Sequence, residues 1–158
     1  MAFPKIGNLA PVFALKNQRG ETVGLKDFRE RNIVVLYFYP AAMTPGCTVQ
    51  ACGLRDSAKQ LAKHGAVVLG ISPDKETKLA RFAERDRLDF ELLSDPDHAV
   101  AEKYGAWGRK KFMGREFDGV LRTTFIVDRD GRLLHVMDKV VTRTHHADVL
   151  ALLAALQA

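Results

Sequence analysis

The stretch that decides the fold is residues 33–56, IVVLYFYPAAMTPGCTVQACGLRD. It opens with seven apolar residues, 33–39, whose length and β-branched content predict a strand buried on both faces. Pro40 ends that strand, and a short loop leads to Cys47. From Cys47 onward apolar residues recur near helical spacing, which predicts a helix to about His64. The sequence therefore places a cysteine at the junction between a buried strand and the helix that follows it.

A cysteine at such a junction is in a position that favours reactivity. The first N–H groups of a helix have no intrahelical partner and the helix dipole is positive there, so that a thiolate is stabilised. We therefore interpret Cys47 as a nucleophile; the alternative is a small buried apolar residue, the commoner role of a free cysteine. For Cys52, five positions later, the alternative is likewise burial within the helix. Two cysteines cannot make a disulfide scaffold, so the pair is better explained by chemistry.

The rest of the chain alternates between strand-like and helix-like segments. A β-hairpin is predicted at 12–15 and 21–23, around a turn signal. Later strands are predicted at 66–71, 90–93, 120–127 and 133–140, and helices at 74–87, 95–104 and 144–156. Residues 106–119, rich in glycine and basic side chains, are predicted to form a loop. This order implies an α/β fold, with a central mixed β-sheet flanked by helices and an N-terminal β-hairpin.

Length and composition are typical of one globular unit. With 158 residues, 47% of them hydrophobic, we expect a single domain spanning residues 1–158. The N-terminus does not resemble a signal peptide, and no apolar run reaches the roughly 18 to 20 residues of a membrane span, so we expect a soluble, cytoplasmic protein. The net charge of +5 is spread along the chain among 19 acidic residues, which favours a solvated surface over a nucleic-acid partner.

A longer motif surrounds the first cysteine. Residues 40–47, PAAMTPGC, fit the pattern Pro-x-x-x-Thr-x-x-Cys of the peroxiredoxins, and the second cysteine resembles their bacterioferritin-comigratory branch, also called PrxQ. Further similarities follow in order along nearly the whole chain: VVLGIS at 67–72, LLSD at 92–95, YGAWG at 104–108, FMG at 112–114 and Arg122 just ahead of TTFIVD. Ala41 and Ala42 depart from the many relatives that carry a charged or polar residue after the motif proline. We expect this departure to alter substrate access slightly and not the reaction.

The resemblance implies a thioredoxin-like fold and a peroxidase that needs no cofactor or metal. It makes Cys47 the peroxidatic cysteine, which attacks hydrogen peroxide or an alkyl hydroperoxide and becomes a sulfenic acid. It makes Cys52 the resolving cysteine, which forms an intramolecular disulfide with Cys47. Thioredoxin or a similar dithiol protein would be the reductant, and relatives suggest a monomeric enzyme of antioxidant defence.

The same resemblance assigns four further residues to the site. Thr44, Arg122 and Gly46 would bind the peroxide, and Pro40 belongs to the catalytic motif. The hydroxyl of Thr44 could also cap the helix that follows it. Arg122 falls on an apolar predicted strand, where an unpaired charge is costly, so we expect it to have an anionic partner or a path to solvent.

Other functions are compatible with parts of the sequence. A thiol-disulfide oxidoreductase would use a cysteine pair, but its usual spacing is Cys-x-x-Cys, against four intervening residues here. A basic nucleic-acid-binding module could be built from one segment: Trp107, Arg109, Lys110, Lys111 and Arg115. The adjacent His145 and His146 begin the last predicted helix, where neighbours point in different directions, so we expect no metal site.

Overall fold

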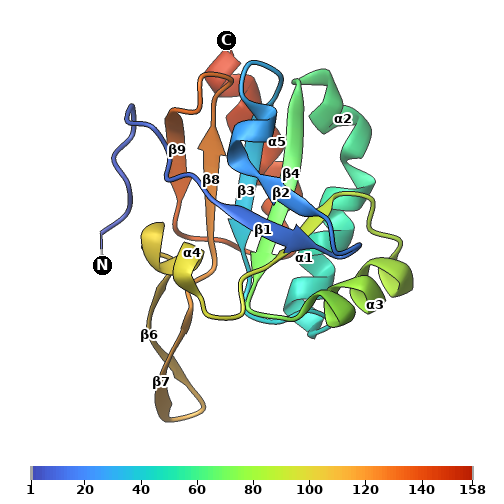
Figure 1. Ribbon diagram of the computed structural model, residues 1–158, viewed down its shortest axis with the longest axis vertical. Helices are drawn as coiled ribbons and strands as arrows, with labels where there is room; N and C mark the ends of the chain where they lie inside the picture. Colours follow the sequence, from blue (N-terminus) through green and yellow to red (C-terminus); the bar gives the residue numbers. More distant parts are fainter. Residues whose placement is uncertain (1, 158) are drawn as a thin grey trace.

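The structure, a computed structural model, describes residues 2–157, and within them the central element is a seven-stranded mixed β-sheet. Its strands are β1 (Ala14–Asn17), β2 (Thr22–Gly24), β3 (Ile33–Phe38), β4 (Ala66–Ser72), β5 (Glu91–Ser94), β8 (Thr123–Val127) and β9 (Leu133–Met137). They lie in the order β2-β1-β5-β4-β3-β8-β9, of which β4, β3, β8 and β9 can be followed across Figure 1. The β3–β4 and β4–β5 pairs are parallel and the others are antiparallel. The predicted mixed sheet and N-terminal hairpin are confirmed.

Helices cover both faces of this sheet, as predicted. One face packs against α1 (Pro45–Asp56), α2 (Ala58–Lys63), α3 (Glu76–Asp86) and α5 (His145–Gln157). The opposite face packs against the single 3-10 turn η1 (Leu25–Phe28) and the short helix α4 (Ala99–Lys103), which lies in front of the sheet in Figure 1. Helix α1, which carries both cysteines, therefore lies on the same face of the sheet as α2, α3 and α5.

Strand β3 lies between β4 and β8 and supplies side chains to two separate cores. Because successive side chains of a strand point to opposite faces, Val35 and Tyr37 join the core under α1 and α5, whereas Val34 and Leu36 join the core under α4. All of β3 is buried, which confirms the prediction of a strand buried on both faces. The loop that follows β3 is therefore anchored at the centre of the sheet.

The helix that begins near Cys47 is shorter than predicted. It ends at Asp56, and Ser57, with φ −95° and ψ 8°, separates α1 from α2. The Ser57 N–H still donates to the Gly53 carbonyl oxygen at 3.2 Å, and the Leu61 N–H donates to the Ser57 carbonyl oxygen at 2.9 Å. The break is thus a local change at one residue, which the spacing of apolar residues does not reveal. Helix α2 then gives way at Gly65, whose positive φ of 70° suits a glycine, as predicted.

Residues 106–119, predicted as a loop, contain most of a second β-hairpin. Strands β6 (Trp107–Phe112) and β7 (Arg115–Val120) pair around Met113 and Gly114, which have φ of 53° and 79°. Positive φ at both turn positions is the geometry of the tightest hairpins. The hairpin projects from the body of the molecule (Figure 1). Many side chains of these strands are exposed and charged, so the sequence lacks the alternation of apolar and polar residues by which strands are normally recognised.

The predicted strand over 120–127 is interrupted. Val120 pairs with Trp107 in the hairpin, whereas Thr123 pairs with Phe38 in the main sheet. The chain must cross from one sheet to the other between them, so Leu121 and Arg122 lie outside both strands. The prediction that Arg122 lies on a strand is therefore wrong.

Candidate active site

The loop between β3 and α1 is held by short hydrogen bonds. The N–H of Ala42 donates to the Asp74 carboxylate at 2.7 Å, which ties the loop to the segment after β4. Met43 has a left-handed backbone with φ of 64°, an uncommon conformation for a residue with a side chain. The Thr44 hydroxyl donates to the Ala41 carbonyl oxygen at 2.8 Å. These contacts fix where α1 begins.

Cys47 is the third residue of α1, and its side chain is only 1% exposed. The guanidinium Nη1 of Arg122 donates to Cys47 Sγ at 3.4 Å. A Cβ added at Gly46 would lie 3.6 Å from Arg122 Nη2, so Gly46 and this nitrogen are neighbours. The sulfur thus lies in the first turn of a helix, beside a permanent positive charge.

The segment 121–122 is what brings Arg122 to the sulfur. The N–H of Leu121 donates to the Ala106 carbonyl at 2.7 Å, which holds the crossing between the two sheets. From there Arg122 Nη1 reaches Cys47 Sγ and also donates to Gln50 Oε1 at 2.7 Å. Arg122 is half-buried, and its partners are a sulfur atom and a neutral amide oxygen. Among the described residues no carboxylate forms a salt bridge with it.

A buried polar chain continues from Gln50. Its Nε2 lies 3.2 Å from His145 Nδ1, and His145 Nε2 lies 2.8 Å from Thr124 Oγ1. All three side chains are 0% exposed. Burial above all lowers the pKa of His145 to about 4, so the imidazole is neutral near pH 7. Helix α1, helix α5 and strand β8 are therefore joined by hydrogen bonds directly behind Arg122.

Cys52 lies on the same helix in a different environment. Its side chain is partly exposed, and burial raises the pKa of its thiol. Among the charges, Arg55 lowers that pKa most, and Asp86 at the end of α3 raises it most. The two cysteines are free thiols. The structure thus places both predicted cysteines on α1 but surrounds them with different neighbours.

The other predicted site residues also lie in this region. Pro40 follows β3 directly, and Gly46 precedes Cys47 within α1. Thr44 is the N-cap residue by its extended backbone, but its side chain makes no capping hydrogen bond because the hydroxyl is bound to Ala41. The capping role predicted for the Thr44 hydroxyl is therefore wrong, and its oxygen lone pairs stay available to accept a hydrogen bond.

The β6–β7 hairpin contributes a basic side chain near this site. Lys110 is half-buried; burial first, and then the charge of Arg122, lower its pKa, while the Cys47 sulfur opposes them. At the base of the hairpin the Trp107 ring stacks on His98, the N-cap residue of α4, with ring centroids 3.7 Å apart. The indole considered for nucleic-acid stacking is thus occupied within the protein.

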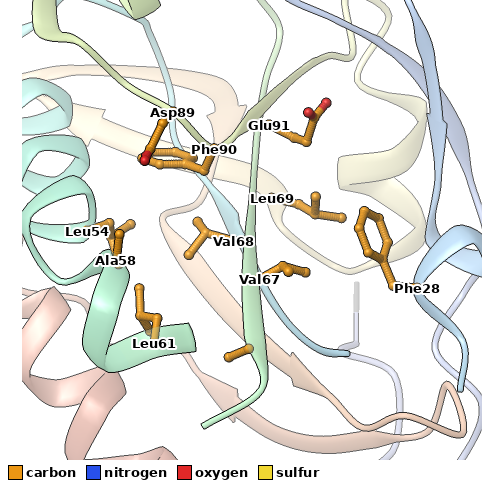
Figure 2. Close-up of a pocket in the computed structure, with 11 residues that line it drawn as sticks. Phe28, Leu54, Ala58, Leu61, Val67, Val68, Leu69, Asp89, Phe90 and Glu91 are labelled. Carbon is orange, nitrogen blue, oxygen red and sulfur yellow. The ribbon is translucent and has the colours of Figure 1, made fainter. Parts of the chain in front are cut away.

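An apolar pocket of about 320 Å³ lies away from the sulfur atoms, along β4. Leu54, Ala58 and Leu61 line it on one side of that strand and Phe28 on the other (Figure 2). Neither a cysteine nor an arginine lines this pocket, so it does not compete with Cys47 as the reactive site.

The described part of the chain contains neither a cluster of metal ligands nor a membrane-spanning helix. Within residues 2–157, no three or more His, Cys, Asp or Glu side chains are grouped so that they could hold a metal ion. Over the same range, every helix is too short or too polar to cross a bilayer.

The chain is similar to several known proteins. Residues 6–136 match the AhpC/TSA family. Peroxiredoxin Bcp of Escherichia coli (strain K12) is 56% identical over 146 residues, which cover 92% of this chain and 93% of that protein. Peroxiredoxin Bcp of Bacillus subtilis (strain 168) is 45% identical over 146 residues, which cover 92% of each chain.

The chain belongs to the AhpC/TSA family, in its Bcp/PrxQ branch of peroxiredoxins.

Solved structures agree with the assignment of this peroxiredoxin. The crystal structure of peroxidoxin BcpB from Mycobacterium tuberculosis has a TM-score of 0.85 at 40% identity and covers 98% of this chain and 99% of its own. The bacterioferritin comigratory protein of Xanthomonas campestris, with described alkyl peroxide reduction activity, has a TM-score of 0.84 at 29% identity, covering 90% of each chain. The predicted thioredoxin-like fold is confirmed. As a peroxiredoxin, the protein is a thiol peroxidase.

Three residues of this peroxiredoxin site were not found from the sequence. Nothing in the sequence indicates that Gln50 and Thr124 are buried at the site, since neutral polar side chains in a helix or a strand are normally at the surface. His145 was considered only as a metal ligand. The periodicity of α5 could have identified it, because His145 lies four residues before Val149, on the buried face of the helix.

Proposed function

We propose that this peroxiredoxin reduces hydrogen peroxide and organic hydroperoxides through Cys47. The Cys47 thiolate attacks one peroxide oxygen and the O–O bond breaks. Cys47 becomes a sulfenic acid, and the second oxygen takes up a proton and leaves as water or an alcohol. The observation that carries this proposal is the 3.4 Å contact between Arg122 Nη1 and Cys47 Sγ, because it places a fixed positive charge beside the reacting atoms.

The remaining donors act on the peroxide. A cysteine with the ordinary pKa of about 8.5 is about 3% thiolate at pH 7, so deprotonation alone gains at most about 30-fold. Enzymatic accelerations begin near about 10⁶, so most of the effect must come from donors aimed at the breaking O–O bond. Arg122 Nη2, next to Gly46, and the first-turn amides of Gly46 and Cys47 are such donors. Thr44 can accept a hydrogen bond from the peroxide O–H.

Cys52 then resolves the sulfenic acid. Its thiolate attacks Cys47 Sγ, the sulfenic oxygen leaves as water, and an intramolecular disulfide forms. Burial raises the pKa of the Cys52 thiol, so an opening of α1 that exposes it would favour the thiolate and the attack. A dithiol protein of the thioredoxin type reduces the disulfide by thiol–disulfide exchange and restores both thiols. Peroxide removal of this kind is antioxidant defence.

Steady-state turnover with hydrogen peroxide and an organic hydroperoxide, coupled to thioredoxin, tests this function. Cys47→Ser should abolish turnover with every peroxide, because the other free thiol, Cys52, does not receive the Arg122 hydrogen bond. Residual activity above about one part in a thousand would place the nucleophile elsewhere. Reduction of insulin by the wild-type protein without consumption of peroxide would instead favour a thiol-disulfide oxidoreductase.

A further inference from the structure

The hydrogen bonds behind Arg122 have directions that chemistry determines. A guanidinium only donates, so Gln50 must turn its oxygen toward Arg122 and its NH₂ group toward His145. His145 Nδ1 must then be an unprotonated acceptor. The proton of the neutral ring is consequently on Nε2, which donates to Thr124 Oγ1.

The same atom of Arg122 serves the sulfur and the amide. Nη1 carries two hydrogens in the guanidinium plane; one is directed at Gln50 Oε1, 2.7 Å away, and the other at Cys47 Sγ, 3.4 Å away. If the Gln50 amide turned over, its NH₂ group would face the guanidinium and repel it. The position of Nη1 at the sulfur therefore depends on the orientation of the Gln50 amide.

We propose that His145 is a positioning residue for the attack on peroxide: its unprotonated Nδ1 fixes the Gln50 amide, which in turn holds Arg122 Nη1 against Cys47 Sγ. This inference rests on the proposed function of Cys47. His145 itself does not touch the sulfur or the peroxide, and acts only through its hydrogen bond to Gln50.

The surroundings of His145 keep the ring in the required state. It is fully buried, with the Tyr37 ring 5.8 Å from its own. The charged and titratable groups that act on it are Asp148 and His146 on α5 and Arg122 across the interface. Asp148 raises the pKa, whereas burial, Arg122 and His146 lower it, and the net result is a pKa of about 4. The acceptor Nδ1 is therefore preserved as the pH falls, until about pH 4.

A double-mutant cycle tests the inference. The measured quantity is the second-order rate of Cys47 oxidation, followed by competition for limiting hydrogen peroxide against a second peroxidase. His145→Leu should slow oxidation by about 10-fold to about 100-fold, the cost of a small misplacement of a catalytic group. In a Gln50→Ala background the same substitution should change the rate by less than about twofold, because the path through the amide is already cut.

Two further variants separate positioning from stability. His145→Asn keeps an acceptor near the place of Nδ1 and should recover most of the rate lost in His145→Leu. Val149→Ala, on the same buried face of α5 one turn later, should lower stability but leave the oxidation rate unchanged. Nitrogen NMR of the wild-type imidazole should find Nδ1 unprotonated and Nε2 protonated from neutral pH down to about pH 4.

The outcomes are distinguishable. Equal slowing by His145→Leu in both backgrounds, equal slowing by His145→Asn and His145→Leu, or a proton on Nδ1 at neutral pH would each overturn the role of His145. A wild-type protein whose Cys47 is not oxidised by peroxide would instead contradict the proposed function itself.

Discussion

Formation of a Cys47–Cys52 disulfide should unwind the start of α1. Both cysteines lie within the single helix Pro45–Asp56. Five helical residues advance about 7.5 Å along the axis and turn through about 500°, which separates the two Cα atoms by about 8.7 Å. A disulfide needs a Cα separation of about 4.4 to 6.8 Å. The bond therefore cannot form in the intact helix.

The cost of unwinding can be estimated from the packing of α1. Releasing its first turns loses a few helical hydrogen bonds at about 1 kcal/mol net each. Ala51, which is fully buried, adds about 0.8 kcal/mol for its methyl group. Leu54, 1% exposed, would add about 1.5 to 3 kcal/mol if it left the core. Unwinding should therefore stop before Leu54, and the opened segment should carry Gln50 away from His145.

Hydrogen exchange measured by mass spectrometry tests this prediction. Amides of residues 48–53 should be well protected in the reduced protein and markedly less protected in the disulfide form, while β3 should change little. Cys52→Ser treated with the same oxidant is the matched control, because it cannot form the bond and should keep α1 protected. Equal protection in the reduced and oxidised wild-type protein, with the Cys47–Cys52 bond confirmed by mass spectrometry, would refute the reasoning.

Two other substitutions separate the steps of the reaction. Cys52→Ser should still reduce one equivalent of peroxide, because the first attack does not use Cys52, but turnover with thioredoxin should collapse and mass spectrometry should find Cys47 as a sulfenic or more oxidised acid; an unaltered catalytic cycle would show that the resolving thiol is another group. Arg122→Ala should slow the oxidation of Cys47 by more than about 30-fold, the most that a change in thiolate fraction can explain, and a higher assay pH should restore only part of the rate. Full recovery at high pH would limit Arg122 to stabilising the thiolate.

Local patterns in the sequence were sufficient to predict most strands of the sheet and the position of Cys47 at the start of a helix. The apolar run that became β3, the parallel strand β4 and the helical periodicity of α3 were all recognisable, because each element buries side chains at the spacing of its own backbone. The roles predicted for Cys47, Cys52, Thr44 and Arg122 came from the motif and its resemblance, and they stay predictions until the variants are measured. The family itself is confirmed by the comparisons.

The reason for some local features lies elsewhere in the chain. A Cβ at Gly53 would lie 2.5 Å from His146 Nδ1, so the glycine leaves room for the His146 ring between α1 and α5. The charged strands of the β6–β7 hairpin looked like a loop, because their pairing partner, not apolar alternation, holds them in place.

The sequence by itself determined that this protein is a peroxiredoxin and which strands form its core. It also determined that a cysteine lies at the start of the helix that follows the central strand, β3. Only the tertiary structure decided what surrounds that cysteine. Arg122 reaches it from a crossing between two sheets, and Gln50 and His145, 95 positions apart, meet in the interface of α1 and α5. Such contacts leave no periodic trace in the sequence, because a buried hydrogen bond depends on the meeting of single atoms from distant segments and not on the repeating spacing of one element.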